Sequence, residues 1–323
     1  MLKSKKRHSI FLLESPLQIK NSISIIESLN LTPIVILRLN SDEQNDYRIK
    51  AISETLECNS IKIFVSIKKS NYFSLLKGML LTLLIALRYR LFGSSVFIGD
   101  YRSFWMKLCA YLISPFKLNI VDDGMASIAV VKKLEARLSS RKACYGFWKL
   151  FTPEFYSYFD MKTIHVKVNK FPSERHYKKR ELTNNVFIVG SPLVEKGIIT
   201  EFNWLKFMSD IVAIACDENA KIEYIPHRAE SLNNIKLLRE AYPKIFVRQL
   251  NEDIEDYIYQ LSFEPVMVIG FYSTALVNLS EILQGTKLVS YELPESSLLR
   301  NKVGIIDVYD YLKLNQRINV YKN

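Results

Sequence analysis

The sequence predicts an α/β protein with two domains, each built on a doubly wound parallel sheet. Short apolar runs typical of buried strands alternate with helical segments throughout the 323 residues. A polar, strongly basic stretch, 167–185, separates two halves that repeat this alternation. The chain is long enough for two hydrophobic cores, and 49% hydrophobic with 24% charged residues is typical of a folded protein.

In the first half, five apolar runs predict strands, and helical stretches between them imply crossovers within a parallel sheet. The first connection is well marked, because Ser15 can cap a helix in which Pro16 takes the first position. Ser15 therefore also faces the carboxyl edge of the sheet, where ligands of such folds bind. The predicted strands are Ser9–Leu13, Pro33–Leu37, Ile61–Val65, Ser95–Ile98 and Leu118–Val121.

The second half repeats the pattern, which predicts domains at 1–170 and 184–323. Together they form two Rossmann-like doubly wound domains facing a central cleft. The predicted strands are Val186–Val189, Lys221–Ile225, Ile245–Val247, Val266–Ile269 and Lys287–Tyr291. The predicted helices are Glu201–Cys216, Leu232–Ala241, Ile254–Leu261 and Thr274–Leu283.

The longest apolar run, Met79–Leu87, bears on membrane association. It is about half the length that a bilayer crossing needs. We expect a well-buried helix; the alternative is a helix that lies on a membrane with its basic ends, Lys77 and Arg88, toward lipid headgroups. The chain is therefore expected to be soluble or peripheral to a membrane.

The charge balance is strongly basic, with a net charge of +11. This favours an anionic membrane surface or a phosphorylated or polyanionic substrate. No recognised nucleic-acid module is found, so nucleic acid is not an expected partner. Four widely spaced cysteines form no C-x-x-C pair, and neither of the glycine-rich loops that bind NAD or ATP is found.

An acidic pair follows the predicted strand that ends at Val121. Gly124 permits a sharp turn that can present Asp122 and Asp123 at the rim of the sheet. Two adjacent carboxylates repel, and partial burial raises the pKa of one, which makes it a better acceptor for a hydroxyl proton. A solvated turn that caps the next helix is the structural alternative. A metal site ranks lowest, since no matching ligand cluster is found.

A histidine follows the strand that ends at Ile225. Pro226, His227 and Arg228 lie at the carboxyl edge of the second sheet. Arg can hold a phosphate bidentately, and His can donate to a leaving phosphate or protonate it. The alternative is a surface loop that happens to contain one of only four histidines.

Two further turns suit a phosphate. Ser273 and Thr274 begin a helix, where unpaired backbone N–H groups and hydroxyls form an anion site, although such residues also cap helices for structural reasons alone. Tyr272 can pack on a base or sugar, or fill a surface between domains. Gly190 and Ser191, after another strand, suit close approach of a ligand, although Gly-Ser-Pro is also common turn chemistry.

These motifs resemble those of the bacterial GT-B-type sialyltransferases, the group of polysialyltransferases and lipooligosaccharide sialyltransferases. That group carries an acidic pair followed by Gly, a His with an adjacent Pro, and a Ser-Ser or Ser-Thr pair, in this order. The matching residues are Asp122-Asp123-Gly124, Pro226-His227 and Ser273-Thr274. Many members have His then Pro, whereas this chain has Pro then His-Arg.

The resemblance implies inverting, metal-independent transfer of sialic acid, or a related nonulosonic acid, from a CMP donor to a glycan hydroxyl. The first domain would bind the acceptor, with Ser15 and Gly124 near it and Asp122 or Asp123 as base. The second would bind the donor. His227, Ser273 and Thr274 would stabilise the departing CMP, so that no cofactor or metal is needed.

The expected acceptor is a lipopolysaccharide, lipooligosaccharide or capsule, and the expected location is the bacterial cytoplasm at the inner leaflet of the inner membrane. Two alternatives stay open. One is a polyol-phosphate transferase that uses CDP-glycerol or CDP-ribitol. The other is a non-catalytic protein that binds glycan or membrane.

Overall fold

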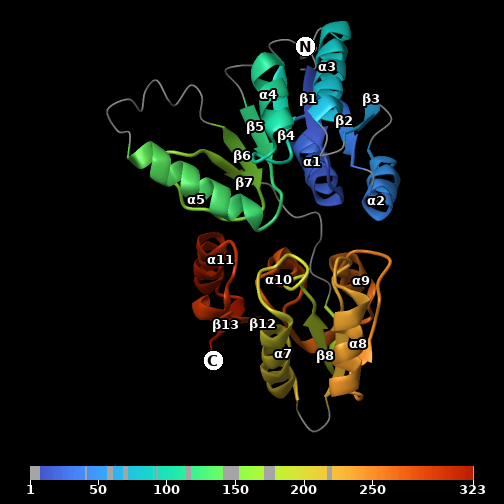
Figure 1. The fold of residues 1–323 in the computed structure, drawn as a ribbon, viewed down its shortest axis with the longest axis vertical. Helices are drawn as coiled ribbons and strands as arrows, with labels where there is room; N and C mark the ends of the chain where they lie inside the picture. The colour runs from blue at the N-terminus through green and yellow to red at the C-terminus, as the bar shows by residue number, and fades with distance from the viewer. Residues whose placement is uncertain are drawn as a thin grey trace. The chain divides into compact units, whose positions relative to one another are not determined.

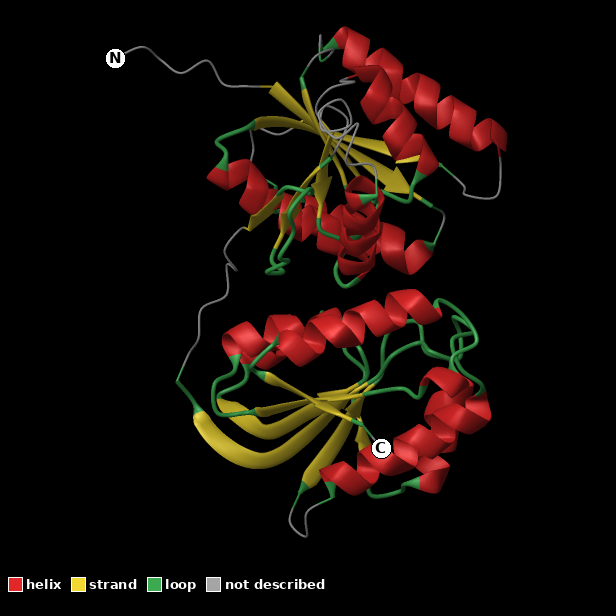
Figure 2. Cartoon of the chain, turned by 90° about the vertical axis from the view of Figure 1, so that its left-hand side faces the viewer, coloured by secondary structure: helices red, strands yellow, loops and turns green. Residues whose placement is uncertain are grey.

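Two compact units, Met1–Pro172 and Ser173–Asn323, make up the chain. The structure is a computed structural model, and each unit holds one parallel sheet with helices on both faces (Figure 1; Figure 2). It describes residues 8–40, 42–56, 61–67, 72–89, 91, 94–113, 118–140, 153–170, 179–216 and 220–322.

The first sheet has the strand order β3-β2-β1-β4-β5-β6-β7, and all of its neighbouring strands are parallel. The order reverses between β1 and β4, and the crevice beyond such a switch point is where open α/β sheets bind ligands. The five predicted strands of this half are confirmed; β6 and β7 were not predicted. The strands are β1 (His8–Leu13), β2 (Thr32–Leu39), β3 (Ile61–Ser66), β4 (Ser95–Ile98), β5 (Leu118–Val121), β6 (Glu154–Ser157) and β7 (Val168–Lys170).

Both faces of this sheet are buried, and successive residues of β1 supply different cores. Ile10 and Leu12 belong to a core cluster that includes residues of α3, α4 and α5, whereas Phe11 and Leu13 belong to one that includes residues of α1 and α2. The helices are α1 (Pro16–Ser28), α2 (Glu43–Ser53), α3 (Tyr72–Arg88), α4 (Phe104–Ile113) and α5 (Ala126–Ser139).

The expectation that the Met79–Leu87 run is well buried is wrong. The run is helical, within α3, but the buried residues of α3 are the small or short Gly78, Thr82 and Ala86 together with Ile85. A Cβ at Gly78 would lie 2.3 Å from Ile67 Cδ1, so the side with small residues is the one that packs inward. No helix of the described residues is long and apolar enough to span a bilayer.

The second sheet repeats the plan, with all strands parallel in the order β10-β9-β8-β11-β12-β13. All five predicted strands and all four predicted helices are confirmed; β13 and α11 were not predicted. The strands are β8 (Glu181–Val189), β9 (Lys221–Ile225), β10 (Phe246–Val247), β11 (Phe263–Gly270), β12 (Lys287–Tyr291) and β13 (Ile318–Tyr321). The helices are α7 (Glu201–Ala215), α8 (Leu232–Ala241), α9 (Ile254–Gln260), α10 (Thr274–Ile282) and α11 (Lys302–Leu314), with a 3-10 turn at Glu295–Ser297.

The predicted linker 167–185 is wrong at both ends. β7 takes Val168–Lys170, and β8 begins at Glu181, so position 184 lies inside a strand. Glu181 and Leu182, the first two residues of β8, are exposed. Polar and basic residues on exposed strand ends imitate a linker in the sequence.

Candidate active site

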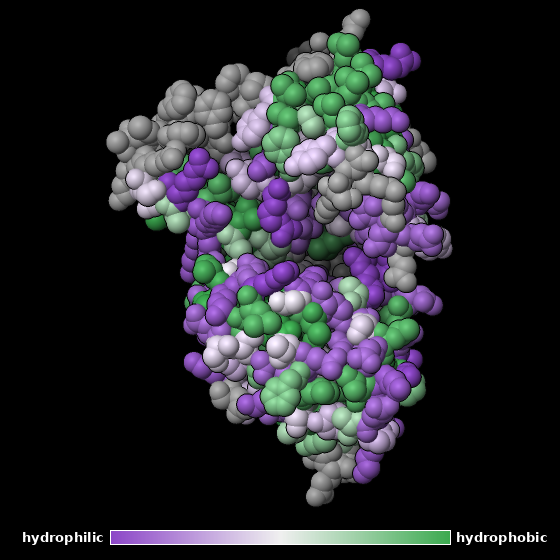
Figure 3. Space-filling model, viewed as in Figure 1, coloured by the Kyte–Doolittle hydropathy of each residue, from purple (hydrophilic) through white to green (hydrophobic). Residues whose placement is uncertain are grey.

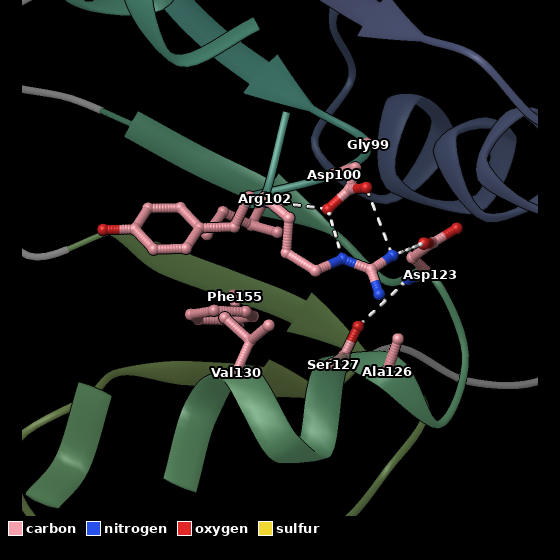
Figure 4. A pocket seen from close by; sticks show the side chains of 10 residues that line it. Gly99, Asp100, Arg102, Asp123, Ala126, Ser127, Val130 and Phe155 are labelled. Carbon is pink, nitrogen blue, oxygen red and sulfur yellow. Dashed lines mark hydrogen bonds and ion pairs between the residues drawn. The ribbon is translucent and has the colours of Figure 1, made fainter. Parts of the chain in front are cut away.

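The carboxyl edge of the first sheet carries a shallow pocket that includes Asp123 (Figure 4). β1 and β4 end together there, since Leu12 pairs with Ile98 in the ladder. The loops after β4 and β5 and the start of α5 supply most of the lining. The lining residues are Gly99, Asp100, Tyr101, Arg102, Ile120, Asp123, Ala126, Ser127, Val130 and Phe155.

Asp123 is held on both of its carboxylate oxygens. Oδ1 accepts a hydrogen bond from Gln18 Nε2 at 2.9 Å, and Oδ2 pairs with Arg102 Nη2 at 2.9 Å. Its side chain is 24% exposed. Burial raises its pKa to about 6; the charges of Asp100 and Glu14 also raise it, whereas Gln18 and Arg102 lower it. A carboxylate with such a pKa is a competent proton acceptor near neutral pH.

Arg102 is shared between two carboxylates. Asp100 accepts hydrogen bonds from its Nε at 2.9 Å and from its Nη2 at 3.1 Å, and the same Nη2 reaches Asp123. The side chain remains 57% exposed. The sequence interpretation missed both Asp100 and Arg102; the available signal is their place directly after the predicted strand Ser95–Ile98, beside the switch point.

Gln18 was also missed. It lies in the first turn of α1, where its Oε1 accepts the backbone N–H of Glu14 at 2.8 Å. A Cβ at Gly99 would lie 2.0 Å from Gln18 Oε1, so only glycine there allows this packing. Ser15 is the N-cap of α1, as expected, and its Oγ accepts the Gln18 N–H at 3.3 Å.

Asp122 lies in the interior, with a relative exposure of 1%. Its Oδ2 accepts a hydrogen bond from Ser157 Oγ and its Oδ1 accepts the Gly124 N–H at 2.7 Å. Burial raises its pKa to about 7. Gly124 has φ 75°, the left-handed conformation that its sequence position predicts. The two acidic side chains thus point to different surroundings, and only that of Asp123 reaches the pocket.

In the second unit, three loops leave the sheet side by side. Val189 of β8 pairs with both Ile225 of β9 and Gly270 of β11, so these strands end at the same level. The ladder therefore brings the predicted donor residues to one edge, although Asp122 and Asp123 belong to the other unit. Those residues are Gly190, Ser191, Pro226, His227, Arg228, Tyr272, Ser273 and Thr274.

His227 is exposed, and its imidazole is oriented by the chain around it. Nδ1 accepts the backbone N–H of Ala229 at 3.0 Å. A neutral ring whose Nδ1 accepts carries its proton on Nε2, so Nε2 is the donor. Pro226 is half-buried and Arg228 is exposed.

A buried carboxyl group that the sequence did not reveal, Glu230, supports the His227 loop. Its Oε2 accepts the His227 N–H at 2.5 Å and its Oε1 accepts the Tyr224 hydroxyl at 2.5 Å. Burial raises its pKa to about 8. A Cβ at Gly190 would lie 2.1 Å from Glu230 Oε2, so the close approach at Gly190 is to this carboxyl group. Ser191 beside it is buried.

Ser273 and Thr274 begin α10 as expected. Ser273 is the N-cap, and its Oγ accepts the Ala275 N–H at 3.2 Å. Tyr272 packs edge-to-face against Tyr309 of the same unit, with ring centroids 5.7 Å apart. Burial raises the pKa of Tyr272 above its usual value. This turn combines a helix start with a hydroxyl, the arrangement that binds anions.

Comparison with known proteins identifies the fold. No protein-family profile matches the sequence, and no curated protein matches it. The chain is similar in structure to MurG of Acinetobacter baumannii, with a TM-score of 0.51 and 11% identity over 98% of this chain and 86% of that one. It is similar to a UDP-glucosyltransferase of Polygonum tinctorium capable of glucosylating indoxyl, with a TM-score of 0.52 and 10% identity over the same shares. The protein has the α/β GT-B fold of glycosyltransferases.

Proposed function

We propose that this protein is an inverting, metal-independent glycosyltransferase that moves sialic acid, or a related nonulosonic acid, from its CMP donor to a hydroxyl of a surface glycan. The observation that carries the proposal is Asp123, a carboxylate in a pocket at the carboxyl edge of a GT-B sheet with its pKa raised to about 6. The choice of a CMP-linked donor rests on the order of the acidic, histidine and serine-threonine motifs in the sequence.

Asp123 is the proposed general base. One of its oxygens accepts the proton of the acceptor hydroxyl while the hydroxyl oxygen attacks the anomeric carbon, and CMP leaves from the opposite face with inversion. Gln18 and Arg102 fix the carboxylate for this transfer. Asp122 is not assigned this role, because its side chain is buried in the interior and does not line the pocket.

The second unit is proposed to hold the donor. His227 presents an Nε2 donor, and the start of α10 with Ser273 and Thr274 adds N–H groups, hydroxyls and a favourable dipole for the phosphate. These groups stabilise the negative charge that grows on CMP, which is why the proposed reaction needs no divalent ion. Arg228 adds a cation beside His227.

A UDP-sugar donor is the second candidate, because one similar structure is a UDP-glucosyltransferase. A donor screen separates the two. Purified protein is incubated with an acceptor glycan and CMP-sialic acid, CMP-Kdo, UDP-glucose or CDP-glycerol, and the released nucleotide is measured.

We expect CMP release from CMP-sialic acid, and its loss in Asp123→Asn. UDP release alone assigns the second candidate, and release of CMP from CDP-glycerol assigns a polyol-phosphate transferase. Activity that survives chelation with EDTA is expected, whereas its loss contradicts the metal-independent mechanism.

The proposed acceptor is a lipopolysaccharide, lipooligosaccharide or capsular chain, assembled at the cytoplasmic face of a bacterial inner membrane. The net charge of +11 suits both an anionic membrane and an acidic acceptor.

A further inference from the structure

Helix α3 presents six large apolar side chains outward, while Ile85, Leu75, Met79 and Leu83 pack on the core of the first unit. A surface helix ordinarily buries its widest apolar stripe, yet here Gly78, Thr82 and Ala86 face inward. The outward stripe is called the α3 face below, and its members are between 53% and 88% exposed. It consists of Tyr72, Phe73, Leu76, Leu80, Leu84 and Leu87.

The α3 face is continuous. Its members from Phe73 to Leu87 recur every three or four residues, the spacing that places them along one side of a helix, and Tyr72 adjoins Phe73. Figure 3 shows hydrophobic side chains gathered over the position that α3 has in Figure 1. Contiguous exposed apolar patches of this kind mark interaction surfaces.

Positive charge borders the α3 face. Lys77 and Arg88 of α3 are exposed, and α3 contains no acidic residue. In a second copy docked on the same face, these cations would meet cations, whereas an anionic lipid surface complements them. Tyr72 adds an aromatic ring with a polar tip, which suits the headgroup region.

The length of α3 indicates how the helix would lie relative to a lipid bilayer. Its 17 residues span about 25 Å, less than the ~30 Å hydrocarbon core of a bilayer, and its most exposed apolar residues lie along one side while the other side packs on the first unit. Such a helix lies in the plane of a bilayer with its apolar side sunk to the headgroup–acyl boundary. We propose that the α3 face docks the protein on an anionic lipid bilayer, with α3 parallel to the surface and Lys77 and Arg88 at the headgroups.

The proposal gives the membrane association suggested above a defined surface, and it is independent of the transfer reaction. The test uses the full-length protein and flotation with phosphatidylcholine vesicles that contain about 30% phosphatidylglycerol. The double variant Leu80→Gln/Leu84→Gln is expected to lower the vesicle-bound to free ratio roughly tenfold or more. Leu232→Gln/Leu314→Gln, at positions 75% and 82% exposed in the second unit, is the matched control and should bind as the unchanged protein does.

The charge arm uses Lys77→Gln/Arg88→Gln. These changes should weaken binding to phosphatidylglycerol vesicles severalfold, and about 0.5 M salt should release much of the unchanged protein. Lys206→Gln, at an exposed position in the second unit, should have little effect. Circular dichroism verifies that each variant remains folded.

Unchanged flotation of the Leu80/Leu84 variant overturns the proposal. The proposal is also overturned if the protein does not bind vesicles and sedimentation shows a dimer that these substitutions dissociate. That result assigns the α3 face to contact with a second copy. Transfer to a soluble acceptor without vesicles should persist in the α3 variants. If the donor screen fails while flotation still depends on the α3 face, the proposed reaction is wrong but the proposed docking surface is retained.

Discussion

The side-chain amide of Gln18 donates to the carboxylate of Asp123 at 2.9 Å, although 105 positions separate the two residues. The orientation of the amide is fixed, because its oxygen already accepts the Glu14 N–H at 2.8 Å. The first turn of α1 therefore helps to set the position of an acid that follows β5. Gly99, at the end of β4, leaves the space that this contact needs.

Asparagine substitutions should separate the roles of the acidic pair. Asp123→Asn keeps the shape but removes the base, so kcat should fall about 10²–10⁴-fold with donor KM nearly unchanged. Asp122→Asn should mainly lower the melting temperature, because the acceptor for the Ser157 hydroxyl or the Gly124 N–H is impaired. Steady-state kinetics and thermal melts measure both. A kcat loss confined to Asp122→Asn would contradict the assignment.

The pH profile should report Asp123. The base must be ionised, so kcat/KM should rise with pH and level off above a midpoint near 6. Arg102→Gln removes a cation that lowers this pKa, so the midpoint should move to higher pH. Lys206→Gln is the distant control. If the midpoint of the pH profile is the same in Arg102→Gln, the titrating group is not Asp123.

Glu230 should make stability depend on pH. Its pKa of about 8 in the folded protein exceeds the usual 4.5, so the folded state holds a proton that the unfolded state releases. Its stabilising contribution is therefore complete below about pH 4.5 and is lost as pH rises through 8, by about 1.4 kcal/mol per pKa unit of difference.

The variant Glu230→Gln lacks this titration. Its deficit relative to the unchanged protein should be largest near pH 5 and should shrink toward pH 8.5, as followed by urea unfolding. Exposed Glu295→Gln is the control. A deficit that is constant over this range would refute the titration of Glu230.

Gly190→Ala tests the packing under the His227 loop. The new Cβ would lie 2.1 Å from Glu230 Oε2 and 2.9 Å from the His227 backbone nitrogen, so the loop must shift. We expect a destabilisation of about 1–3 kcal/mol and a higher donor KM. Gly285→Ala, whose nearest contact would be 3.3 Å, should cost less. Equal effects of the two substitutions would speak against a special constraint at Gly190.

The repeated strand–helix pattern made most of the fold predictable, because buried parallel strands such as β1 and β2 contain continuous apolar runs. The strands that escaped, β6, β7 and β13, have partly exposed or polar residues. The run within α3 was predicted correctly as helical, but the prediction that it is well buried is wrong. An apolar run is buried only where another part of the chain covers it, and apolar content cannot say which side of a helix meets the sheet.

The candidate site was predictable where a side chain follows a strand directly, as Asp123 and His227 do. Gln18 and Glu230 could not be identified, since their contacts exist only in the folded chain, and the place of Arg102 after a predicted strand indicates the edge of the sheet but not its partner Asp123. Gln18 in particular reads as an ordinary helix residue. Its contact with Asp123 depends on the registers of β1 against β4 and of β4 against β5, which bring distant loops together.

The burial of Asp122 means that the two residues of the acidic pair differ in their contacts and in the roles proposed for them. Asp122 ties the end of β5 to Ser157 at the end of β6, while Asp123 is the proposed general base. If the buried and the pocket-lining acid exchanged positions in the sequence, the turn after β5 would need a different backbone conformation. A search for relatives of this chain should therefore demand a serine at the end of the next strand together with the two acids.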